Sequence, residues 1–241
     1  MNQGIIKVPL APVRLENSDK SEMTSEFLFG EPVRILEERN NWVKCASFVD
    51  EYVGWIDKRM FYGVDLGNFD KIYRSESILE KVHSPFGVLN IPAGSWLYPE
   101  INVLSYNPAA SKATPAEWAS KFLGAPYRWG GKTVLGIDCS GLTQLSFSLA
   151  GLKIPRDAYM QAEIGEGIPF IDLAETNDLA FFDNAEGRIT HVGIVLMSDG
   201  DSKIIHSSGN VRIDKLDHQG IFNEETGQYS HNLRFIKRVT L

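Results

Sequence analysis

The stretch "GIDCSGLTQLSFSLAG", residues 136–151, decides how the C-terminal half of the chain folds. Asp138 is a residue type that caps helix N-termini, and three leucines beginning at Leu142 follow at i, i+3 and i+7. Gly151 is a typical stop after a helix. The stretch therefore predicts a helix that begins at Asp138, ends just before Gly151, and carries Cys139 in its first turn.

The position of Cys139 points to a reactive thiol. The exposed N–H groups and the dipole at a helix N-terminus favour negative charge, so they are expected to lower a thiol pKa and raise the thiolate fraction. The thiolate is the nucleophilic form. We expect Cys139 to act as a nucleophile rather than as a small buried apolar residue. The second cysteine, Cys45, lies inside a predicted strand and is interpreted as a packing residue.

A nucleophilic thiol needs a base, and "THVGIVL" supplies His191 in a predicted strand. Period-two alternation puts His191 and Gly193 on one face, where Gly193 leaves room for another element to approach. His206, in the next segment "IIHSSG", could orient the His191 ring if the two strands pair. The remaining histidines are expected at the surface: His83, His218 and His231.

The order of elements indicates the fold class of the second half. Thr114, Pro115 and Glu117 form a capping box with proline at the first helical position, which predicts a short helix that opens this domain. Strands follow the cysteine-bearing helix, at residues 179–183, 189–197, 202–209 and near the C-terminus. Helices followed by a run of strands predict an α+β domain with an antiparallel sheet.

The first half of the chain has a different sequence pattern from the second half. Short strands are predicted at residues 31–38, 42–49 and 51–56, with a turn at Asn40-Asn41, and this spacing is typical of a small β-barrel. Residues 63–110 either complete the barrel or form a connector of their own. We therefore expect two domains, residues 1–110 and residues 111–241.

Composition limits the class of protein. With 241 residues, 43% of them hydrophobic and 23% charged, the chain can build a core, and its net charge of −7 argues against a nucleic-acid partner. The chain has no run of about 18 apolar residues, which is what a membrane span would require. The chain has no CxxC pair that would predict a zinc site. We expect neither a metal nor another cofactor. The start "MNQGIIKVPL" lacks the pattern of a signal peptide, so we expect a cytoplasmic protein.

Three motifs together carry a resemblance. "YRWGGKTVLGIDCSGL", followed by "THVGIVL" and "IIHSSG", resembles the NlpC family of papain-like cysteine peptidases, which cut bacterial cell-wall peptides. The resemblance covers residues 112–240 and implies a papain-like α+β domain. The N-terminal region is similar to the bacterial SH3-like β-barrel that is often attached to these enzymes.

The resemblance also implies a subgroup. "SEMTSEFLFGE" together with "EYVGWI" is similar to the members that release L-Ala-γ-D-Glu from peptides with a free amino terminus. In that subgroup the SH3-like domain shapes the active-site cleft, and an acidic residue and a tyrosine from it hold the substrate amine. These roles fall on Tyr52 and Glu22, with Glu26 as the competitor of Glu22.

The family pattern assigns the other site residues one by one. Cys139 is implied as the nucleophile, His191 as the base and His206 as the residue that orients it. The main-chain N–H of Cys139 would contribute to the oxyanion hole, because helix N-termini present such donors. The remaining implied roles are a hydroxyl donor at that hole for Tyr127, a cleft wall for Trp129, and recognition of γ-D-Glu for Asp138 and Ser140.

The expected function is hydrolysis of the bond between γ-D-Glu and L-Lys or meso-diaminopimelate in cell-wall peptides, in peptidoglycan recycling, without nucleic-acid or membrane partners. A non-catalytic cell-wall binding module is the alternative from another class. A zinc site built from Cys139, His191 and His206 is a second alternative, although the chain has no HExxH helix. The third is an amide hydrolase or acyltransferase of the same fold.

Overall fold

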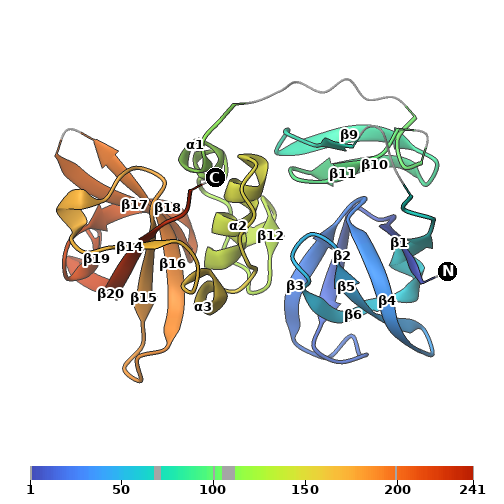
Figure 1. Ribbon diagram of the computed structural model, residues 1–241, viewed down its shortest axis with the longest axis horizontal. Coiled ribbons are helices and arrows are strands. Elements are labelled where there is room, and N and C mark those ends of the chain that lie inside the picture. Colours follow the sequence, from blue (N-terminus) through green and yellow to red (C-terminus); the bar gives the residue numbers. More distant parts are fainter. Residues whose placement is uncertain (1, 68–71, 100, 105–111, 199, 241) are drawn as a thin grey trace. The chain divides into compact units, whose positions relative to one another are not determined.

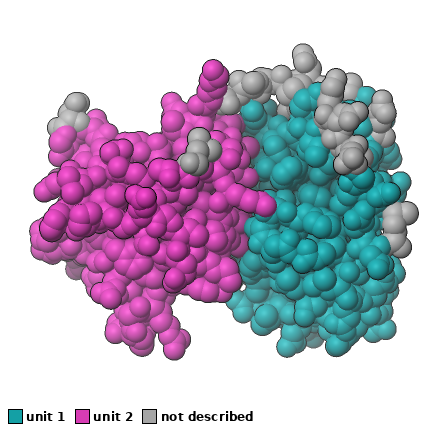
Figure 2. Space-filling model, viewed as in Figure 1, with its two compact units in different colours: residues 1–111, 129–134 teal, residues 112–128, 135–241 magenta. Residues whose placement is uncertain are grey.

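The structure of the protein is a computed structural model, which describes residues 2–67, 72–99, 101–104, 112–198 and 200–240. The chain forms two compact units, coloured separately in Figure 2. Unit 1 comprises residues 1–111 and 129–134, and unit 2 comprises residues 112–128 and 135–241. The segment 129–134, which a single boundary near residue 110 would place in the second domain, therefore belongs to unit 1.

Unit 1 is built on a seven-stranded antiparallel sheet with the order β3-β2-β6-β5-β4-β1-β7. The predicted turn at Asn40-Asn41 joins β4 to β5, and Asn40 takes a φ of 52°, a left-handed value that asparagine tolerates. The strands are β1 (Gln3–Ile6), β2 (Leu10–Arg14), β3 (Met23–Leu28), β4 (Pro32–Arg39), β5 (Trp42–Ser47), β6 (Val53–Asp57) and β7 (Phe61–Gly63), with a 3-10 turn, η1 (Lys58–Met60), before β7.

The sheet of unit 1 encloses a fully buried apolar core. Val13, Phe27, Val43 and Ile56 come from four different strands, and all are at most 1% exposed. Cys45 is buried in the same core, as its interpretation as a packing residue requires. Burial raises the pKa of the Cys45 thiol to about 12, so this thiol stays neutral.

Residues 73–97 form a small structure of their own, because their strands pair only with one another in the described part of the chain. Val82, Ile91 and Leu97 pack around Phe29 in a separate buried cluster. Gly30 takes a φ of +72°, and a Cβ there would lie 1.8 Å from the Trp96 carbonyl oxygen. The prediction for residues 63–110, that they complete the barrel or form a connector, includes residues 105–110, which lie outside the described residues. The strands are β8 (Tyr73–Arg74), β9 (Leu79–Ser84), β10 (Gly87–Pro92) and β11 (Trp96–Leu97).

Two helices of unit 2, α1 and α2, begin where the sequence predicts, whereas α3 was not predicted. Thr114 and Glu117 form the capping box of α1, with both reciprocal hydrogen bonds present. Asp138 caps α2 by accepting a hydrogen bond from the Gly141 N–H at 2.6 Å. No helix of the described residues is long and apolar enough to cross a membrane. The helices are α1 (Pro115–Ser120), α2 (Cys139–Leu149) and α3 (Ala158–Gln161).

The sheet of unit 2 is antiparallel and has the order β14-β20-β15-β16-β17-β18-β19, with β19 also pairing with β20. This extra pairing closes β15 to β20 into a ring. The strands are β14 (Glu166–Ile168), β15 (Leu179–Asp183), β16 (Ile189–Ser198), β17 (Asp201–Ser208), β18 (Asn210–Leu216), β19 (Gly220–Asn223) and β20 (Gln228–Arg238), with a 3-10 turn, η2 (Ile171–Leu173), between β14 and β15.

The three helices of unit 2 lie on one side of this sheet, and each contacts β16 (Figure 1). Leu142 and Leu145 of α2 are at most 2% exposed, and burial of each leucine side chain contributes about 1.5–3 kcal/mol to stability. This packing fixes the N-terminus of α2 next to β16 and β17. The prediction of an α+β fold with an antiparallel sheet behind an N-terminal β-domain is confirmed.

Candidate active site

Cys139 opens α2 and lies against the backbone of β16. The sulfur accepts hydrogen bonds from the backbone N–H groups of Ser140 and Val192, and the residue is 6% exposed. Since Val192 directly follows His191, the structure brings the thiol to the strand that carries the predicted base. The cap at Asp138 and the packing of α2 on β16 together set this position.

The pKa of Cys139 differs from the sequence-based expectation. The helix N-terminus predicts a lowered pKa, but burial raises the pKa of this thiol to about 12, and the charge of Asp138 acts in the same direction. The N–H groups of Val192 and Ser140 favour the thiolate only partly. The resting residue is therefore a thiol, whose proton must leave as the sulfur attacks.

His191 is 5% exposed on β16, and burial lowers its pKa well below the ordinary value, so the ring is neutral near pH 7. Its Nε2 lies 2.9 Å from Nδ1 of His206, which is on the paired strand β17. Gly193 lies opposite His206, and a Cβ there would lie 2.9 Å from the His206 Cβ. Gly193 thus provides space for the neighbouring strand's side chains.

A third histidine belongs to this cluster, and the expectation that His231 is a surface residue is wrong. The His231 ring stacks on the His191 ring, with 4.1 Å between the centroids and 21° between the planes. His231 lies on β20, which pairs with β15, the strand next to β16, and also with β19. Burial and the nearby His206 lower the pKa of His231 to about 4.

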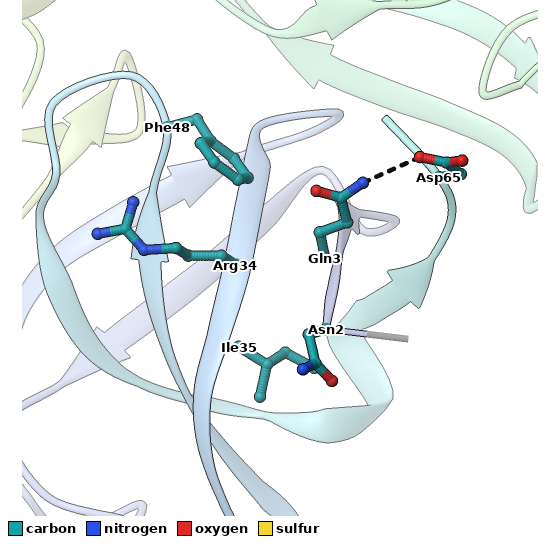
Figure 3. A pocket seen from close by; sticks show the side chains of 6 residues that line it. All are labelled: Asn2, Gln3, Arg34, Ile35, Phe48 and Asp65. Atoms are coloured by element: carbon teal, nitrogen blue, oxygen red, sulfur yellow. Dashed lines mark hydrogen bonds between the residues drawn. The ribbon is translucent and has the colours of Figure 1, made fainter. Parts of the chain in front are cut away.

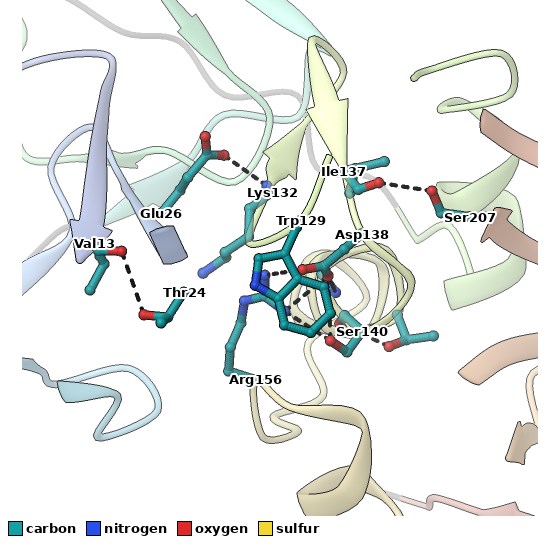
Figure 4. A network of polar contacts seen from close by, with 12 residues as sticks. Val13, Thr24, Glu26, Trp129, Lys132, Ile137, Asp138, Ser140, Arg156 and Ser207 are labelled. Carbon is teal, nitrogen blue, oxygen red and sulfur yellow. Dashed lines mark hydrogen bonds and ion pairs between the residues drawn. The ribbon is translucent and has the colours of Figure 1, made fainter. Parts of the chain in front are cut away.

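Asp138 and Ser140 join a buried polar network around Arg156 (Figure 4). The Arg156 guanidinium donates to both carboxylate oxygens of Asp138, at 3.0 and 2.7 Å, and to the Ser140 hydroxyl at 2.9 Å. Arg156 is 2% exposed. Arg156 is not among the predicted site residues, and nothing in "LKIPRDAY" distinguishes it from the nearby Lys153.

Tyr127 precedes α2 and lies in the electrostatic field of Cys139. A backbone bridge to Ile137 and a hydrogen bond from the Tyr127 N–H to the Gly209 carbonyl hold this residue in unit 2. Burial raises the pKa of the Tyr127 hydroxyl to about 12, and the nearby Cys139 and Asp138 add to the effect. The phenol therefore keeps its proton and remains a hydrogen-bond donor.

The other predicted binding residues lie in unit 1. The Trp129 indole N–H donates to a carboxylate oxygen of Glu22 at 2.8 Å, and both side chains are exposed. The Tyr52 hydroxyl donates to the Thr24 carbonyl at 3.3 Å, and its ring packs against the core of unit 1. A hydrogen bond thus holds Tyr52 at Thr24, inside β3. Another holds Glu22, which lies directly before β3.

Glu26 differs from Glu22 in its surroundings. Glu26 is fully buried, and one of its carboxylate oxygens accepts a hydrogen bond from the Lys132 backbone N–H at 2.8 Å (Figure 4). Lys132 lies on β12 (Lys132–Thr133), within the segment 129–134. In the same segment Gly130 has a φ of +74°, and a Cβ there would lie 2.7 Å from the Met23 carbonyl oxygen. Glu26 is therefore a structural anchor for this segment.

Unit 1 also has an open hollow of about 720 Å³ near β1 and β4 (Figure 3). None of the residues that line it is among the predicted site residues. The Gln3 side chain donates to Asp65 across its rim at 3.0 Å. The lining residues are Asn2, Gln3, Arg34, Ile35, Phe48 and Asp65.

The cluster in unit 2 has the parts of a thiol hydrolase. A sulfur at a helix N-terminus, a buried neutral imidazole on the strand that the sulfur contacts and a second imidazole hydrogen-bonded to the first are the kinds of group that a nucleophile, a base and an orienting residue require. Within the described residues, no group of three or more His, Cys, Asp and Glu side chains is arranged to hold a metal ion. The arrangement suits acyl transfer through a thioester.

Comparison with known proteins agrees with this geometry. Residues 124–229 match the model of the NlpC/P60 family, and residues 13–59 match that of the bacterial dipeptidyl-peptidase SH3 domain. Dipeptidyl-peptidase 6 of Lysinibacillus sphaericus is 29% identical over 263 residues, which cover 90% of this chain and 92% of that protein. The gamma-D-glutamyl-L-lysine dipeptidyl-peptidase of Bacillus subtilis is 46% identical over 88 residues, 36% of this chain and 28% of that protein.

A solved structure shows the same fold over nearly the whole chain. The crystal structure of an NlpC/P60 family protein from Bacillus cereus has a TM-score of 0.77 at 18% identity, and the match covers 98% of this chain and 99% of that one. Because the NlpC/P60 match and the names of the relatives support a peptidase, the alternative of a non-catalytic binding module is not retained. The chain thus carries an NlpC/P60 cysteine peptidase domain with a bacterial dipeptidyl-peptidase SH3 domain in front of it.

Proposed function

We propose that this peptidase hydrolyses bacterial cell-wall peptides at the amide bond between γ-D-Glu and L-Lys or meso-diaminopimelate, and that it requires a free N-terminal L-Ala. The observation that carries the proposal is the hydrogen bond from the Val192 N–H to the Cys139 sulfur, next to the buried base His191. The names of two relatives, a dipeptidyl-peptidase and a gamma-D-glutamyl-L-lysine dipeptidyl-peptidase, support the choice of bond.

The reaction proceeds by acyl transfer to sulfur. The Cys139 thiol gives its proton to His191 as the sulfur attacks the γ-carbonyl of the D-glutamyl residue. The Cys139 N–H and the Tyr127 hydroxyl stabilise the oxyanion, because both remain donors at neutral pH. The intermediate then collapses to a thioester, and protonated His191 gives its proton to the leaving amine. Water, deprotonated by the same imidazole, attacks the thioester and regenerates the thiol.

A free amine is recognised by charge. An ammonium group forms charge-assisted hydrogen bonds with a carboxylate, and a tyrosine hydroxyl adds a neutral partner. Glu22 is exposed and held in place by the Trp129 indole, whereas Glu26 is buried and bonded to the Lys132 N–H. These surroundings favour Glu22 over Glu26 as the residue that binds the amine, together with Tyr52.

Recognition of γ-D-Glu falls to the polar network at the start of α2. The Asp138 carboxylate caps α2 and holds Arg156 through a bidentate ion pair, so it acts on the substrate through Arg156 and Ser140. The Ser140 hydroxyl is positioned by the same guanidinium. Trp129 would provide a flat wall for the peptide. A place in peptidoglycan recycling and a cytoplasmic location stay predictions from the sequence.

The experiment compares three peptides: L-Ala-γ-D-Glu-L-Lys, L-Ala-γ-D-Glu-meso-diaminopimelate and an N-acetylated form of whichever is cleaved. Mass spectrometry should detect the dipeptide L-Ala-γ-D-Glu from the free amine and little or none from the blocked one. Glu22→Gln should raise KM for the free amine and leave the slow cleavage of the acetylated peptide unchanged. Equal rates on the free and acetylated peptides would contradict recognition of the amine.

Glu26→Gln is the matched comparison for Glu22→Gln. Because Glu26 anchors residues 129–134 from inside unit 1, this variant should lower the free energy of unfolding. Glu22→Gln should leave it unchanged. Tyr52→Phe removes only the hydroxyl and should raise KM for the free amine without changing stability by more than about 1.5 kcal/mol. A Glu22→Gln variant with the wild-type KM would instead exclude Glu22 as the amine-binding residue.

A further inference from the structure

The hydrogen-bond chain that begins at His191 does not end at His206. Nε2 of His206 lies 2.9 Å from an oxygen of the Asp214 carboxylate, while its Nδ1 lies 2.9 Å from Nε2 of His191. His206 is 1% exposed and Asp214 is 7% exposed, so the chain is shielded from water. Asp214 is not among the residues that the sequence predicts for the site.

The strand register explains why these three side chains meet. His206 pairs directly with Arg212 across β17 and β18, and Asp214 lies two residues farther along β18. His206 also pairs with Gly193 across β16 and β17, and His191 lies two residues before Gly193. Residues two apart on a strand share a face, and diagonal neighbours remain within reach of long side chains. Asp214 and His191 are thus the two diagonal partners of His206.

An ionised carboxylate only accepts hydrogen bonds. Asp214 therefore determines which nitrogen carries the proton in each neutral histidine ring of this series of hydrogen bonds. Facing Asp214, Nε2 of His206 must carry a proton, so in the neutral ring Nδ1 of His206 is an acceptor. Nε2 of His191 must then donate to it. The neutral His191 ring is left with an unprotonated Nδ1, which is the form that can take a proton from the thiol of Cys139.

We propose that Asp214 is a positioning residue for the peptidase reaction, which acts through His206 to hold His191 as the Nε2–H tautomer with Nδ1 available as the base. When the Cys139 proton moves to Nδ1, His191 becomes an imidazolium that still donates from Nε2 to His206. The negative charge of Asp214, one imidazole away, stabilises that cation. The inference rests on the proposed function, since it concerns the same base.

The groups around Asp214 keep it ionised. Burial pushes its pKa upward, but hydrogen bonds from His206 and Arg212 outweigh burial, so the pKa lies below the ordinary value. The Arg212 guanidinium donates to the other carboxylate oxygen at 2.8 Å and is itself paired with Glu225 at 3.4 Å. The His231 ring from β20 also packs against the base, and the Cys139 sulfur at the start of α2 accepts a hydrogen bond from the N–H of Val192, the residue after the base.

The first test observes the tautomers directly and needs no substrate. Histidine side-chain ¹⁵N spectra of the full-length protein near neutral pH should show Nε2 protonated and Nδ1 unprotonated in both His191 and His206. In Asp214→Ala the preference should be lost, because Nε2 of His206 no longer has an acceptor. A wild-type His191 protonated mainly at Nδ1, or unchanged tautomers in Asp214→Ala, would overturn the proposal even if the peptidase activity is confirmed.

The second test separates positioning from folding. Asp214→Asn should lower kcat by about 10- to 100-fold with KM nearly unchanged, because the lost interaction acts on the base in the transition state. Asp214→Glu should recover part of the rate. Asp217→Asn is the matched control, since the Asp217 carboxylate accepts hydrogen bonds from Tyr229 and backbone N–H groups rather than from a histidine. An equal loss of kcat in Asp217→Asn would show that the effect is a general one of charge or folding.

Discussion

The His231 ring stacks on the His191 ring at a centroid separation of 4.1 Å, which places a half-buried imidazole against the proposed catalytic base. The folded-state pKa of His231 is about 4, and an unfolded histidine titrates near 6.5. Between these values the unfolded chain binds more protons than the folded protein. The free energy of unfolding must therefore rise with pH through this window, and stability is lost as the pH falls from about 6.5.

His231→Phe should reduce this acid sensitivity, because phenylalanine keeps an aromatic ring against His191 but has no proton to bind. Urea unfolding at a series of pH values between about 4 and about 7.5 measures the effect. The variant should lose less stability on acidification than the wild type does. The same pH dependence in both proteins would show that His231 titrates normally in the folded state.

The burial of Cys139 predicts how its thiol reacts. With its pKa raised to about 12, the resting residue is a thiol, so the rate of alkylation by iodoacetamide should keep rising from about pH 6 to about pH 9. A Cys45→Ala background removes the only other thiol in the chain. A rate that reaches a plateau below neutral pH would instead indicate a resting thiolate–imidazolium pair.

Arg156 compensates a buried charge at the start of α2. Arg156→Leu would leave the Asp138 carboxylate, 5% exposed, without its bidentate partner, and should lower the free energy of unfolding by about 3–5 kcal/mol. The double variant Asp138→Asn/Arg156→Leu should lose less, since asparagine caps the helix without a charge.

Arg234→Leu is the surface comparison for Arg156→Leu, because the Arg234–Asp183 pair is 3.5 Å apart and the arginine side chain is 60% exposed. This change should cost no more than about 1 kcal/mol. Denaturant midpoints and slopes measure all three variants. A similar small loss for Arg156→Leu would mean that the folded protein does not depend on the ion pair between Arg156 and Asp138.

Gly193 sets the spacing between β16 and the side chains of β17. In Gly193→Ala, the new Cβ would lie 2.6 Å from the Ile204 Cδ1 and 2.9 Å from the His206 Cβ, so His206 must shift. We expect a loss of about 1–3 kcal/mol in stability and a fall in kcat, because the shift disturbs the bond to His191. Gly167→Ala, in the same sheet, meets no atom within 4 Å and should change neither. Wild-type kcat in Gly193→Ala would contradict this role of His206.

Local signals in the sequence were sufficient for the helices of unit 2 and for much of the fold. The capping box at Thr114 and the cap at Asp138 fix where α1 and α2 begin, because both depend on neighbouring residues only. The order of helices and strands gave the α+β class. The closure of the sheet could not be predicted, since the pairing of β19 with β20 depends on contacts between distant segments.

Strand pairing also explains what the site prediction lacked. The polar sequence around His231 gave no sign of its contact with His191, because that contact depends on how β20, β15 and β16 pair. The position of Asp214 could have been predicted from the sequence. The turn at Gly209 predicts a hairpin, and the register of that hairpin places Asp214 diagonal to His206. The pKa of Cys139 could not be predicted from the helix N-terminus, because the desolvation that opposes it arises from tertiary packing.

The most direct measurement of the central claim incubates L-Ala-γ-D-Glu-meso-diaminopimelate and its L-Lys counterpart with the wild-type protein and with Cys139→Ala, and identifies the products by mass. The wild type should release L-Ala-γ-D-Glu and the free diamino acid from at least one of the two peptides, and Cys139→Ala should leave both intact. Intact peptides in the presence of the folded wild-type protein, or the same dipeptide released by Cys139→Ala, would contradict the claim.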